Sequence, residues 1–277
     1  GLGDVYKRQI NGSPAAVDLD QDGDLEVVFT SYNGSTGDVH AIHHDGSTFY
    51  GFPVYLNEKM VGGPAAGDLD GDGNKEIVFG TSAGVIYVIS NLGVVHMIYE
   101  QEGSILDVPV LSDLDQDGDV EIIFTSNHES GGVLYAIHDT GDDVSGFPIN
   151  VSSSTINSCP SIADIESDGL LDIIISTRSW NDQHGWSVNI HAIDGYGALK
   201  EGFPFSVEGE NSSPVTLIDL DNDNLTYCWE QLDSGQVDAS NFGPELLTGS
   251  INRSIPPSDN KIRYIPSISE ILNGNLT

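Results

Sequence analysis

The chain has 277 residues, and its 38% hydrophobic content with 32 glycines and 12 prolines is typical of a β-rich domain with many tight turns, which argues against a helical bundle. Nine Lys and Arg against 43 Asp and Glu give a formal net charge of −34, which excludes nucleic acid and anionic membrane surfaces as partners because both would repel the protein. Many of the acids cluster in short strings, and this clustering favours bound cations.

The first nine residues are set aside from the fold prediction. The segment Asp4-Val-Tyr-Lys-Arg-Gln9 resembles the translation of a transposon end sequence that is used to prepare sequencing libraries. We therefore interpret residues 1–9 as a library artefact and expect the natural protein to begin further upstream. No apolar run reaches the roughly 20 residues that a membrane-spanning helix needs, so we expect no membrane span in this chain.

An acidic string recurs along the chain and defines a repeat. Four copies have Asp at the first position, an acid at the third, Asp-Gly at the fifth and sixth, and an acid at the ninth. These copies are Asp18–Glu26, Asp68–Glu76, Asp113–Glu121 and Asp164–Asp172. A weaker fifth copy begins at Asp219, and successive first aspartates are 50, 45, 51 and 55 residues apart. A repeat of this length corresponds to one blade of a β-propeller.

Each repeat predicts four short strands. A proline precedes the first Asp by four residues in the four clear copies, and a β-branched run that we expect to be buried on both faces follows each string. These runs are Glu26–Phe29, Glu76–Phe79, Glu121–Phe124 and Asp172–Ile175. A third strand is predicted at 39–42, 86–89, 134–137 and 190–193. Three repeats then carry Gly-Phe-Pro ending at Pro53, Pro148 and Pro204, as an outer strand without ladder donors permits.

One such unit cannot bury both faces of its sheet alone, so neighbouring units must stack. We predict an all-β β-propeller over residues 10–224, with four full blades of four antiparallel strands and a partial fifth, followed by a short irregular C-terminal extension, 225–277. The expected units are residues 12–61, 62–106, 107–157, 158–212 and, in part, 213–224. A linear array of sheets and a β-sandwich remain as alternatives.

The spacing of the acids distinguishes between types of metal loop. A helix–loop–helix calcium loop needs Glu at position 12, but that position holds Phe29, Phe79, Phe124 and Ile175. The loop must therefore close at position 9 and lead into a strand. Positions 1, 3, 5 and 9 would supply carboxylates, position 7 a backbone carbonyl, and the position 6 glycine the sharp bend.

These positions define the predicted metal ligands. They are Asp18, Asp20, Asp22, Asp24, Glu26, Asp68, Asp70, Asp72, Asn74, Glu76, Asp113, Asp115, Asp117, Asp119, Glu121, Asp164, Glu166, Asp168, Leu170 and Asp172. Oxygen ligands without His or Cys favour a hard cation, and a flexible chelate favours Ca²⁺ over Mg²⁺. We expect about four calcium sites, the fourth weaker because Glu166 replaces Asp, and none at the fifth string, where Asn224 and Tyr227 replace the glycine and the last acid. The alternative is a set of solvated Asp-Gly turns.

These residues resemble the FG-GAP and VCBS repeats, the calcium-loop blades of integrin α-chain propellers and of many secreted bacterial proteins, over roughly residues 12–224. The resemblance implies a secreted or cell-surface module for adhesion, ligand binding or scaffolding within a larger exported bacterial protein. Residues 225–277 resemble a stretch of secreted bacterial metalloproteases, through Leu225–Gln231, Gly243-Pro244 and Pro256-Pro257. The His-Glu-x-x-His zinc signature is absent, so no catalytic residue is carried over. The abrupt change at this junction also permits an assembly chimera.

No catalytic motif is found, so we expect no enzyme activity in this chain. The alternatives are a propeller-type polysaccharide lyase and an accessory module of a metalloprotease. His40 and His191 share the repeat register of Tyr87 and Tyr135, which predicts packed strand positions. Trp180 and Trp186 are expected in a loop, either as anchors or as a contact for a sugar or a peptide. A protein or carbohydrate ligand is therefore left open, as is a disulfide between the only two cysteines, Cys159 and Cys228.

Overall fold

The computed structural model describes residues 8–152, 155–156, 158–182, 185–209 and 215–217, and its regular elements are all β-strands. The chain divides into two compact units, 1–215 and 216–277; the account below concerns the first. The predicted fifth acidic string, the C-terminal segment and Cys228 lie outside the described residues. No helix in the described part is long and apolar enough to cross a membrane.

Within the described part of the chain, seventeen strands form four antiparallel sheets. The first sheet has the order β1 (Ala15–Val17), β2 (Glu26–Asn33), β3 (Thr36–Ile42), β4 (Val54–Leu56). The second has the order β5 (Ala65–Gly67), β6 (Glu76–Gly80), β7 (Val85–Ile89), β8 (Val95–Glu100). The third comprises β9 (Val110–Ser112), β10 (Glu121–His128), β11 (Gly131–Ile137) and β12 (Ile149–Ser152). The fourth comprises β13 (Thr155–Ile156), β14 (Ser161–Ala163), β15 (Asp172–Asn181), β16 (Gly185–Asp194) and β17 (Phe205–Glu208).

The strand order within each sheet follows the chain, so each repeat is a meander. In the fourth sheet, two short strands, β13 and β14, pair with different parts of β15 where the other sheets have one inner strand. The Gly-Phe-Pro prolines lie directly before the outer strands β4, β12 and β17. Their Phe-Pro peptide bonds are cis in all three repeats. The prediction of four short strands per unit is confirmed for the first three repeats and extended by one strand in the fourth.

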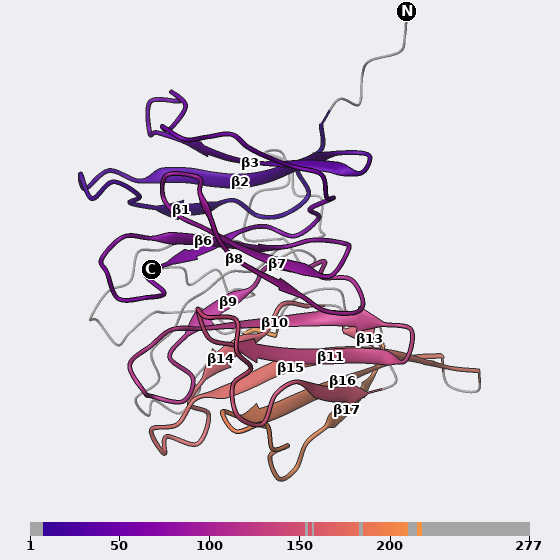
Figure 1. Cartoon of the computed structure of the whole chain (residues 1–277). Coiled ribbons are helices and arrows are strands. Elements are labelled where there is room, and N and C mark those ends of the chain that lie inside the picture. Colours follow the sequence, from indigo (N-terminus) through magenta and orange to yellow (C-terminus); the bar gives the residue numbers. More distant parts are fainter. Residues whose placement is uncertain (1–7, 153–154, 157, 183–184, 210–214, 218–277) are drawn as a thin grey trace, which may run out of the picture. The chain divides into compact units, whose positions relative to one another are not determined.

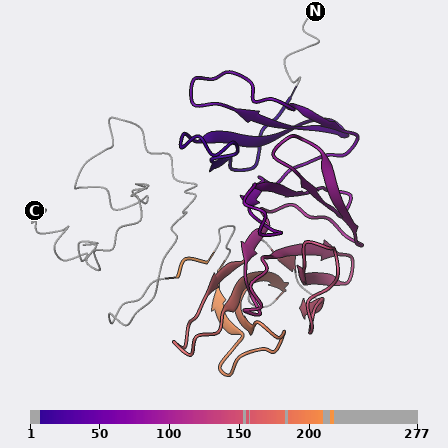
Figure 2. The same ribbon diagram turned by 60° about the vertical axis from the view of Figure 1, so that its left-hand side comes forward.

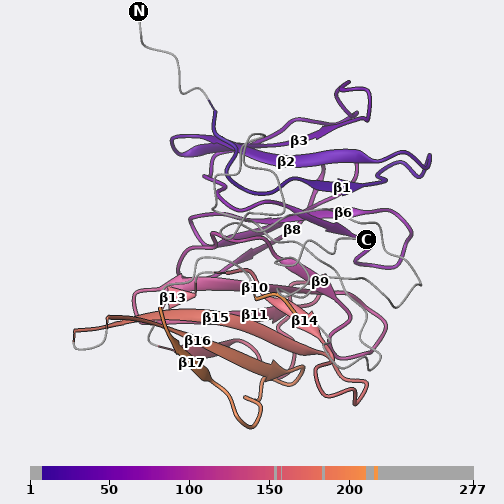
Figure 3. The ribbon, with the colours of Figure 1, turned by 180° about the vertical axis from the view of Figure 1, so that it is seen from behind.

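Consecutive sheets pack face to face, as Figures 1 and 3 show. One core cluster joins Val28 of the first sheet to Phe79 of the second, and the next joins Val78 of the second to Phe124 of the third. A third cluster joins Ile123 of the third sheet to Ile175 of the fourth. The second and third sheets thus each pack against two neighbours, which a two-layer sandwich cannot provide.

The inner strands of successive sheets approach one another, with β1 in contact with β5 and β5 in contact with β9. Figure 2 shows the successive sheets stacked in chain order. Two glycines before β5 make this close approach possible. A Cβ on Gly63 would lie 2.1 Å from the Ser13 carbonyl oxygen, and one on Gly62 would lie 2.5 Å from that of Asp107. In a β-propeller the sheets stack face to face and their inner strands lie close together. The β-propeller fold class is therefore confirmed, in preference to the linear array.

Burial of the second strands differs between the first sheet and the others. Strand β6 is buried throughout and β10 is buried over Glu121–Ser126, as predicted, but in β2 the side chains of Val27 and Phe29 are only half-buried. Only the second sheet packs on the first sheet among the described residues, so one face of β2 lacks a partner. Arg8 and Gln9, which belong to the segment interpreted as a library artefact, contact the first sheet: Gln9 pairs with Tyr32, and Arg8 forms an ion pair with Asp38.

Candidate metal centre

The four acidic strings form the turns between the first two strands of each repeat. We call them loop 1 (18–26), loop 2 (68–76), loop 3 (113–121) and loop 4 (164–172) and number their positions 1 to 9. The predicted bend at position 6 is confirmed: φ is +95°, +93°, +101° and +88° at Gly23, Gly73, Gly118 and Gly169. Position 4 is left-handed as well, with φ of +63°, +73°, +63° and +56° at Gln21, Gly71, Gln116 and Ser167.

The ninth acid closes each loop from the first residue of the following strand. Its carboxylate accepts a hydrogen bond from the backbone N–H of position 2, an apolar residue that is buried in loops 1 to 3. The N to O distances are 2.9 Å for Leu19–Glu26, 3.0 Å for Leu69–Glu76, 2.6 Å for Leu114–Glu121 and 3.2 Å for Ile165–Asp172. Glu26, Glu121 and Asp172 are fully buried and Glu76 is 4% exposed. Acids so deeply buried need a partner for their remaining oxygen.

Backbone N–H groups within the loops donate hydrogen bonds to the other acids. The Asp at position 5 accepts the N–H of position 7 in every loop, at 2.9, 2.7, 3.0 and 2.9 Å. The Asp at position 1 accepts the glycine N–H in loops 1, 2 and 4, at 3.1, 3.0 and 2.7 Å. In Asp18 and Asp68 the bond to the glycine uses Oδ2 and leaves Oδ1 for a further partner. Both oxygens of Asp72 are already used, because its second oxygen accepts the Asn74 side-chain amide at 3.0 Å.

Carboxylate oxygens converge in the first three loops. Oxygens from three acids lie within 4.8 Å of one another in each: Asp18, Asp20 and Asp22; Asp68, Asp70 and Glu76; Asp113, Asp115 and Glu121. Positions 1 and 3 belong to every group, whereas Glu26, Asp72 and Asp117 lie outside the group of their loop. In all three loops, the Oδ1 atom of the first Asp is buried and has no hydrogen-bond partner: Asp18, Asp68 and Asp113. A buried carboxylate oxygen without a donor fits a bound cation.

Loop 4 is arranged differently, and its predicted ligands are not brought together as in the first three loops. Both oxygens of Asp164 accept backbone hydrogen bonds, Oδ1 from Asp168 at 3.1 Å and Oδ2 from Gly169 at 2.7 Å. The ammonium of Lys200 lies 2.7 Å from Asp172 Oδ1 and 3.0 Å from Glu166 Oε2. A cation of the chain itself thus contacts positions 3 and 9 of this loop.

The pKa shifts of the acids also differ between loops 2 and 3 on one side and loop 4 on the other. Burial, with Asp68, Asp70 and Asp72 nearby, raises the pKa of Glu76, and burial with Asp115 and Asp117 nearby raises the pKa of Glu121, where the Leu114 N–H and His138 oppose the shift. Although desolvation opposes it, the backbone N–H groups of loop 4 lower the pKa of Asp164. Although desolvation again opposes it, hydrogen bonds to Asp172 and Glu166 raise the pKa of Lys200. Loops 2 and 3 therefore carry an excess of negative charge, which Lys75 at 3.8 Å from Asp68 Oδ2 and His138 at 3.3 Å from Glu121 Oε1 offset only in part and a bound cation would neutralise.

One family match covers the first two loops from the first acid of loop 1 to Phe79 in β6. Residues 18–79 match the model of the FG-GAP-like repeat. No curated protein matches the chain. Among solved structures, BamB from Moraxella catarrhalis is 15% identical with a TM-score of 0.48 over 76% of this chain, and this chain spans only 56% of that one. BBS1N in complex with ARL6DN, soaked with lead, is 12% identical with a TM-score of 0.42, covering 77% of this chain and 75% of that one.

Three residues outside the four loops contact the ninth acids and were not predicted. His43 Nδ1 lies 3.0 Å from Glu26 Oε1, His138 Nδ1 lies 3.3 Å from Glu121 Oε1, and Lys200 contacts Asp172. The repeat register could have indicated the histidines, because each follows directly after the third predicted strand segment. The prediction that His40 and His191 are packed strand residues is confirmed: His40 stacks on Phe29 at 4.8 Å, and His191 is 5% exposed.

Two pairs of neighbouring loops are joined by the glutamine side chain at position 4. The Gln21 amide donates to the Gly73 carbonyl at 2.8 Å, which connects loop 1 to loop 2. Gln116 likewise donates to the Gly169 carbonyl and connects loop 3 to loop 4. The loops therefore lie next to one another at the same end of adjacent sheets.

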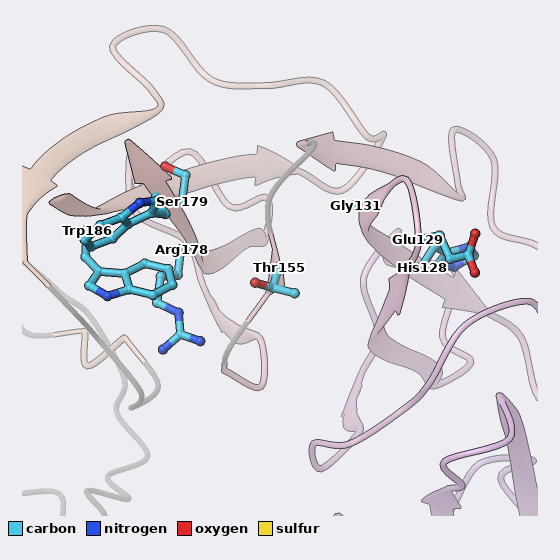
Figure 4. Close-up of a pocket in the computed structure, with 8 residues that line it drawn as sticks. His128, Glu129, Gly131, Thr155, Arg178, Ser179 and Trp186 are labelled. Atoms are coloured by element: carbon cyan, nitrogen blue, oxygen red, sulfur yellow. The ribbon is translucent and has the colours of Figure 1, made fainter. Parts of the chain in front are cut away.

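A pocket of about 380 Å³ lies away from these loops, between the β10–β11 turn and the β15–β16 hairpin. Figure 4 shows Arg178 and Trp186 on one side, His128 and Glu129 on the other and Thr155 between them. The expectation that Trp180 and Trp186 lie in a loop was wrong: they end two long strands and face each other across the hairpin. Their rings are 5.1 Å apart, the Arg178 guanidinium lies 4.4 Å from the Trp186 ring, and Trp180 is 57% exposed.

Proposed function

We propose that this protein is an extracellular β-propeller module that is stabilised by Ca²⁺ and serves in ligand binding, adhesion or scaffolding within a larger exported protein. One observation carries the calcium proposal: Asp18, Asp68 and Asp113 each aim a buried oxygen without a donor into a group of three carboxylates. The same orphaned atom in three repeats is explained by one kind of ligand in each.

The chemistry of the groups selects the ion. Each group consists of carboxylate oxygens alone, which suits a hard divalent cation, and the short flexible loop suits the larger Ca²⁺ with its 6 to 8 ligands. The position 7 carbonyl and water would complete the shell. Calcium would neutralise carboxylates that otherwise repel one another within a single turn. In loops 2 and 3 it would also hold the end of the first strand to the start of the second, because position 1 directly follows the first strand and position 9 begins the second.

Thermal unfolding in calcium and in chelator tests this proposal. A ligand that binds only the folded state stabilises it by about 1.4 kcal/mol for each site at ten times its Kd, so three such sites raise Tm by roughly 10–15 °C. We expect Tm to rise with calcium in the millimolar range, where loops of extracellular modules bind, and magnesium at the same concentration to have a smaller effect. An identical Tm in excess calcium and excess chelator would contradict the proposal.

A substitution of the first Asp of loop 2 tests a single site. Asp68→Asn keeps the size of the side chain and its acceptor for the Gly73 N–H, but it removes the charge that faces the cation. We expect this variant to bind one calcium fewer and to lose part of the calcium-dependent rise in Tm. Retention of the full calcium count would show that the group formed by Asp68, Asp70 and Glu76 is not the site.

We further propose that the pocket between the third and fourth sheets binds a carbohydrate. A broad, exposed indole such as that of Trp180 offers an apolar face for the C–H groups of a sugar ring, and the neighbouring Arg178 and Thr155 offer donors for its hydroxyl groups. The test is binding to an array of neutral and uronic-acid oligosaccharides. We expect Trp180→Ala to abolish binding and Tyr55→Ala, at a residue 69% exposed on β4, to leave it unchanged. Binding that survives Trp180→Ala, or no binding to any array member, would contradict this assignment.

A further inference from the structure

We infer that the ammonium of Lys200 takes the place of the metal ion in loop 4, so that this loop is closed by a cation of the chain itself and binds no calcium. The inference rests on the proposed calcium sites of loops 1 to 3 and limits calcium binding to those three loops. It revises the sequence expectation of a fourth, weaker site to three sites and one internally closed loop.

The position of Lys200 in the repeat is the first argument. Its backbone N–H donates to Ala192 at 2.9 Å, and the N–H groups of Phe49 and Val144 donate to Ala41 and Ala136 in the same way. These three residues are therefore equivalent in the first, third and fourth repeats. Phe49 is 5% and Val144 is 2% exposed, so a lysine has replaced a core residue. A charge at such a position requires a fixed counter-charge, and loop 4 provides it.

The two carboxylates that Lys200 contacts are the second argument. They occupy positions 3 and 9, and the same positions contribute oxygens to the groups of loops 2 and 3. His43 and His138 contact only the ninth acid. Lys200 therefore differs from these histidines, because it bridges two predicted metal ligands. Glu166 has one methylene more than the Asp at this position elsewhere, and its carboxylate meets the ammonium.

The state of the first Asp is the third argument. In loops 1 to 3 its Oδ1 atom is buried without a donor, whereas in loop 4 both oxygens of Asp164 accept backbone N–H groups. The carboxylate oxygen that lacks a donor in three loops has a hydrogen-bond donor in the fourth. Loop 4 thus has both an internal cation and no orphaned oxygen at position 1, and these two observations are independent of each other.

Calcium stoichiometry tests the inference on the full chain. We expect equilibrium dialysis at saturating calcium to give three equivalents per chain. The matched pair Asp68→Asn and Asp164→Asn changes the same position in loop 2 and loop 4: the first should reduce the count to two, and the second should leave it at three. Four equivalents in the unmodified protein, or a loss of one equivalent in Asp164→Asn, would overturn the inference while leaving the calcium proposal intact. A count of zero would overturn both.

A gain of binding provides a second test. Lys200→Met with Glu166→Asp restores an apolar residue in the position of Phe49 and the usual acid at position 3. We expect this double variant to bind a fourth calcium, and its Tm to fall below that of the unmodified protein in chelator and to recover when calcium is added. If the folded variant still binds three equivalents, Lys200 is not what closes loop 4.

Discussion

The backbone N–H of Leu69 donates a 3.0 Å hydrogen bond to Oε2 of Glu76, from the second position of loop 2 to the ninth. This bond joins the two ends of the acidic turn and holds a carboxylate that is 4% exposed beside Asp68 and Asp70. Leu69 in turn is buried in the core between the second and third sheets. Metal binding and core packing are therefore coupled through a single residue pair, and loss of the ion should affect the stability of the whole blade.

Glu76→Gln should have opposite effects with and without calcium. The amide keeps an acceptor for Leu69 but removes a buried charge. Because burial and neighbouring acids raise the pKa of Glu76, the folded apo protein takes up a proton here before the unfolded chain does. The charged group therefore destabilises the fold above its raised pKa, and this loss is relieved as the pH falls through it.

In chelator at pH 8, we expect Glu76→Gln to stabilise the protein by about 1–3 kcal/mol, and this gain should shrink toward pH 5. In saturating calcium, the variant should be less stable than the unmodified protein because it lacks a ligand. Urea denaturation at the two pH values measures both effects. A variant that is less stable in chelator at pH 8 would contradict the charge argument.

Gly63→Ala should destabilise the fold at the contact between the inner ends of the first two repeats. The added Cβ would lie 2.1 Å from the Ser13 carbonyl oxygen, so the backbone must shift, which typically costs about 1–3 kcal/mol. The control is Gly67→Ala, whose Cβ would meet only the terminal Leu111 Cδ1 atom at 3.0 Å. Equal midpoints of urea denaturation for the two variants would argue against close approach of the inner strands.

Tyr87 should titrate far above the usual range of tyrosine. Desolvation, the hydrogen bond from its hydroxyl to Glu58 Oε1 at 2.8 Å, and the charge of Glu58 raise its pKa to about 12. Tyr87→Phe should remove this component from the ultraviolet titration and lower the free energy of unfolding by about 1–2 kcal/mol. The Thr81 hydroxyl donates to the other carboxylate oxygen of Glu58, so Glu58 keeps one hydrogen-bond partner in the Tyr87→Phe variant. A titration curve that is unchanged in the variant would refute the assignment.

His191→Tyr should stabilise the protein in mildly acidic solution. Burial lowers the pKa of His191, so the unfolded chain binds a proton here more readily than the folded protein. Stability is consequently lost as the pH falls from about 6.5 through the lowered folded pKa. The equivalent residues in the second and third repeats are Tyr87 and Tyr135, so the position accepts tyrosine. We expect the difference in Tm between the variant and the unmodified protein to grow from pH 7 to pH 5.

The control for this prediction is His96→Tyr on strand β8, where the side chain is exposed. This change should leave the pH dependence of Tm as it is. A His191→Tyr variant whose Tm follows the pH in parallel with the unmodified protein would show that His191 is not buried in its neutral form.

The sequence by itself determined the features that repeat. The spacing of the acidic strings, the position 6 glycines and the β-branched runs specify local conformation, and local conformation depends on neighbours along the chain. The prediction of a nine-residue turn between two strands was therefore correct in all four loops, as was the packed register of His40 and His191. The predicted ligands, however, came from an idealised loop, in which Glu26, Asp72 and Asp117 were expected to join the groups that the structure forms without them.

Only the tertiary structure decided which loops carry an unsatisfied oxygen. Lys200 is 28 residues from Asp172 along the chain and reaches it because β15 and β16 pair in register and return the chain to the loop. In the same way, Trp180 and Trp186 became a cross-strand pair because the hairpin extends further in the fourth sheet than in the others. A repeat motif predicts what its own residues can do, whereas the charge that faces them depends on a contact between segments distant in sequence, which no local pattern encodes.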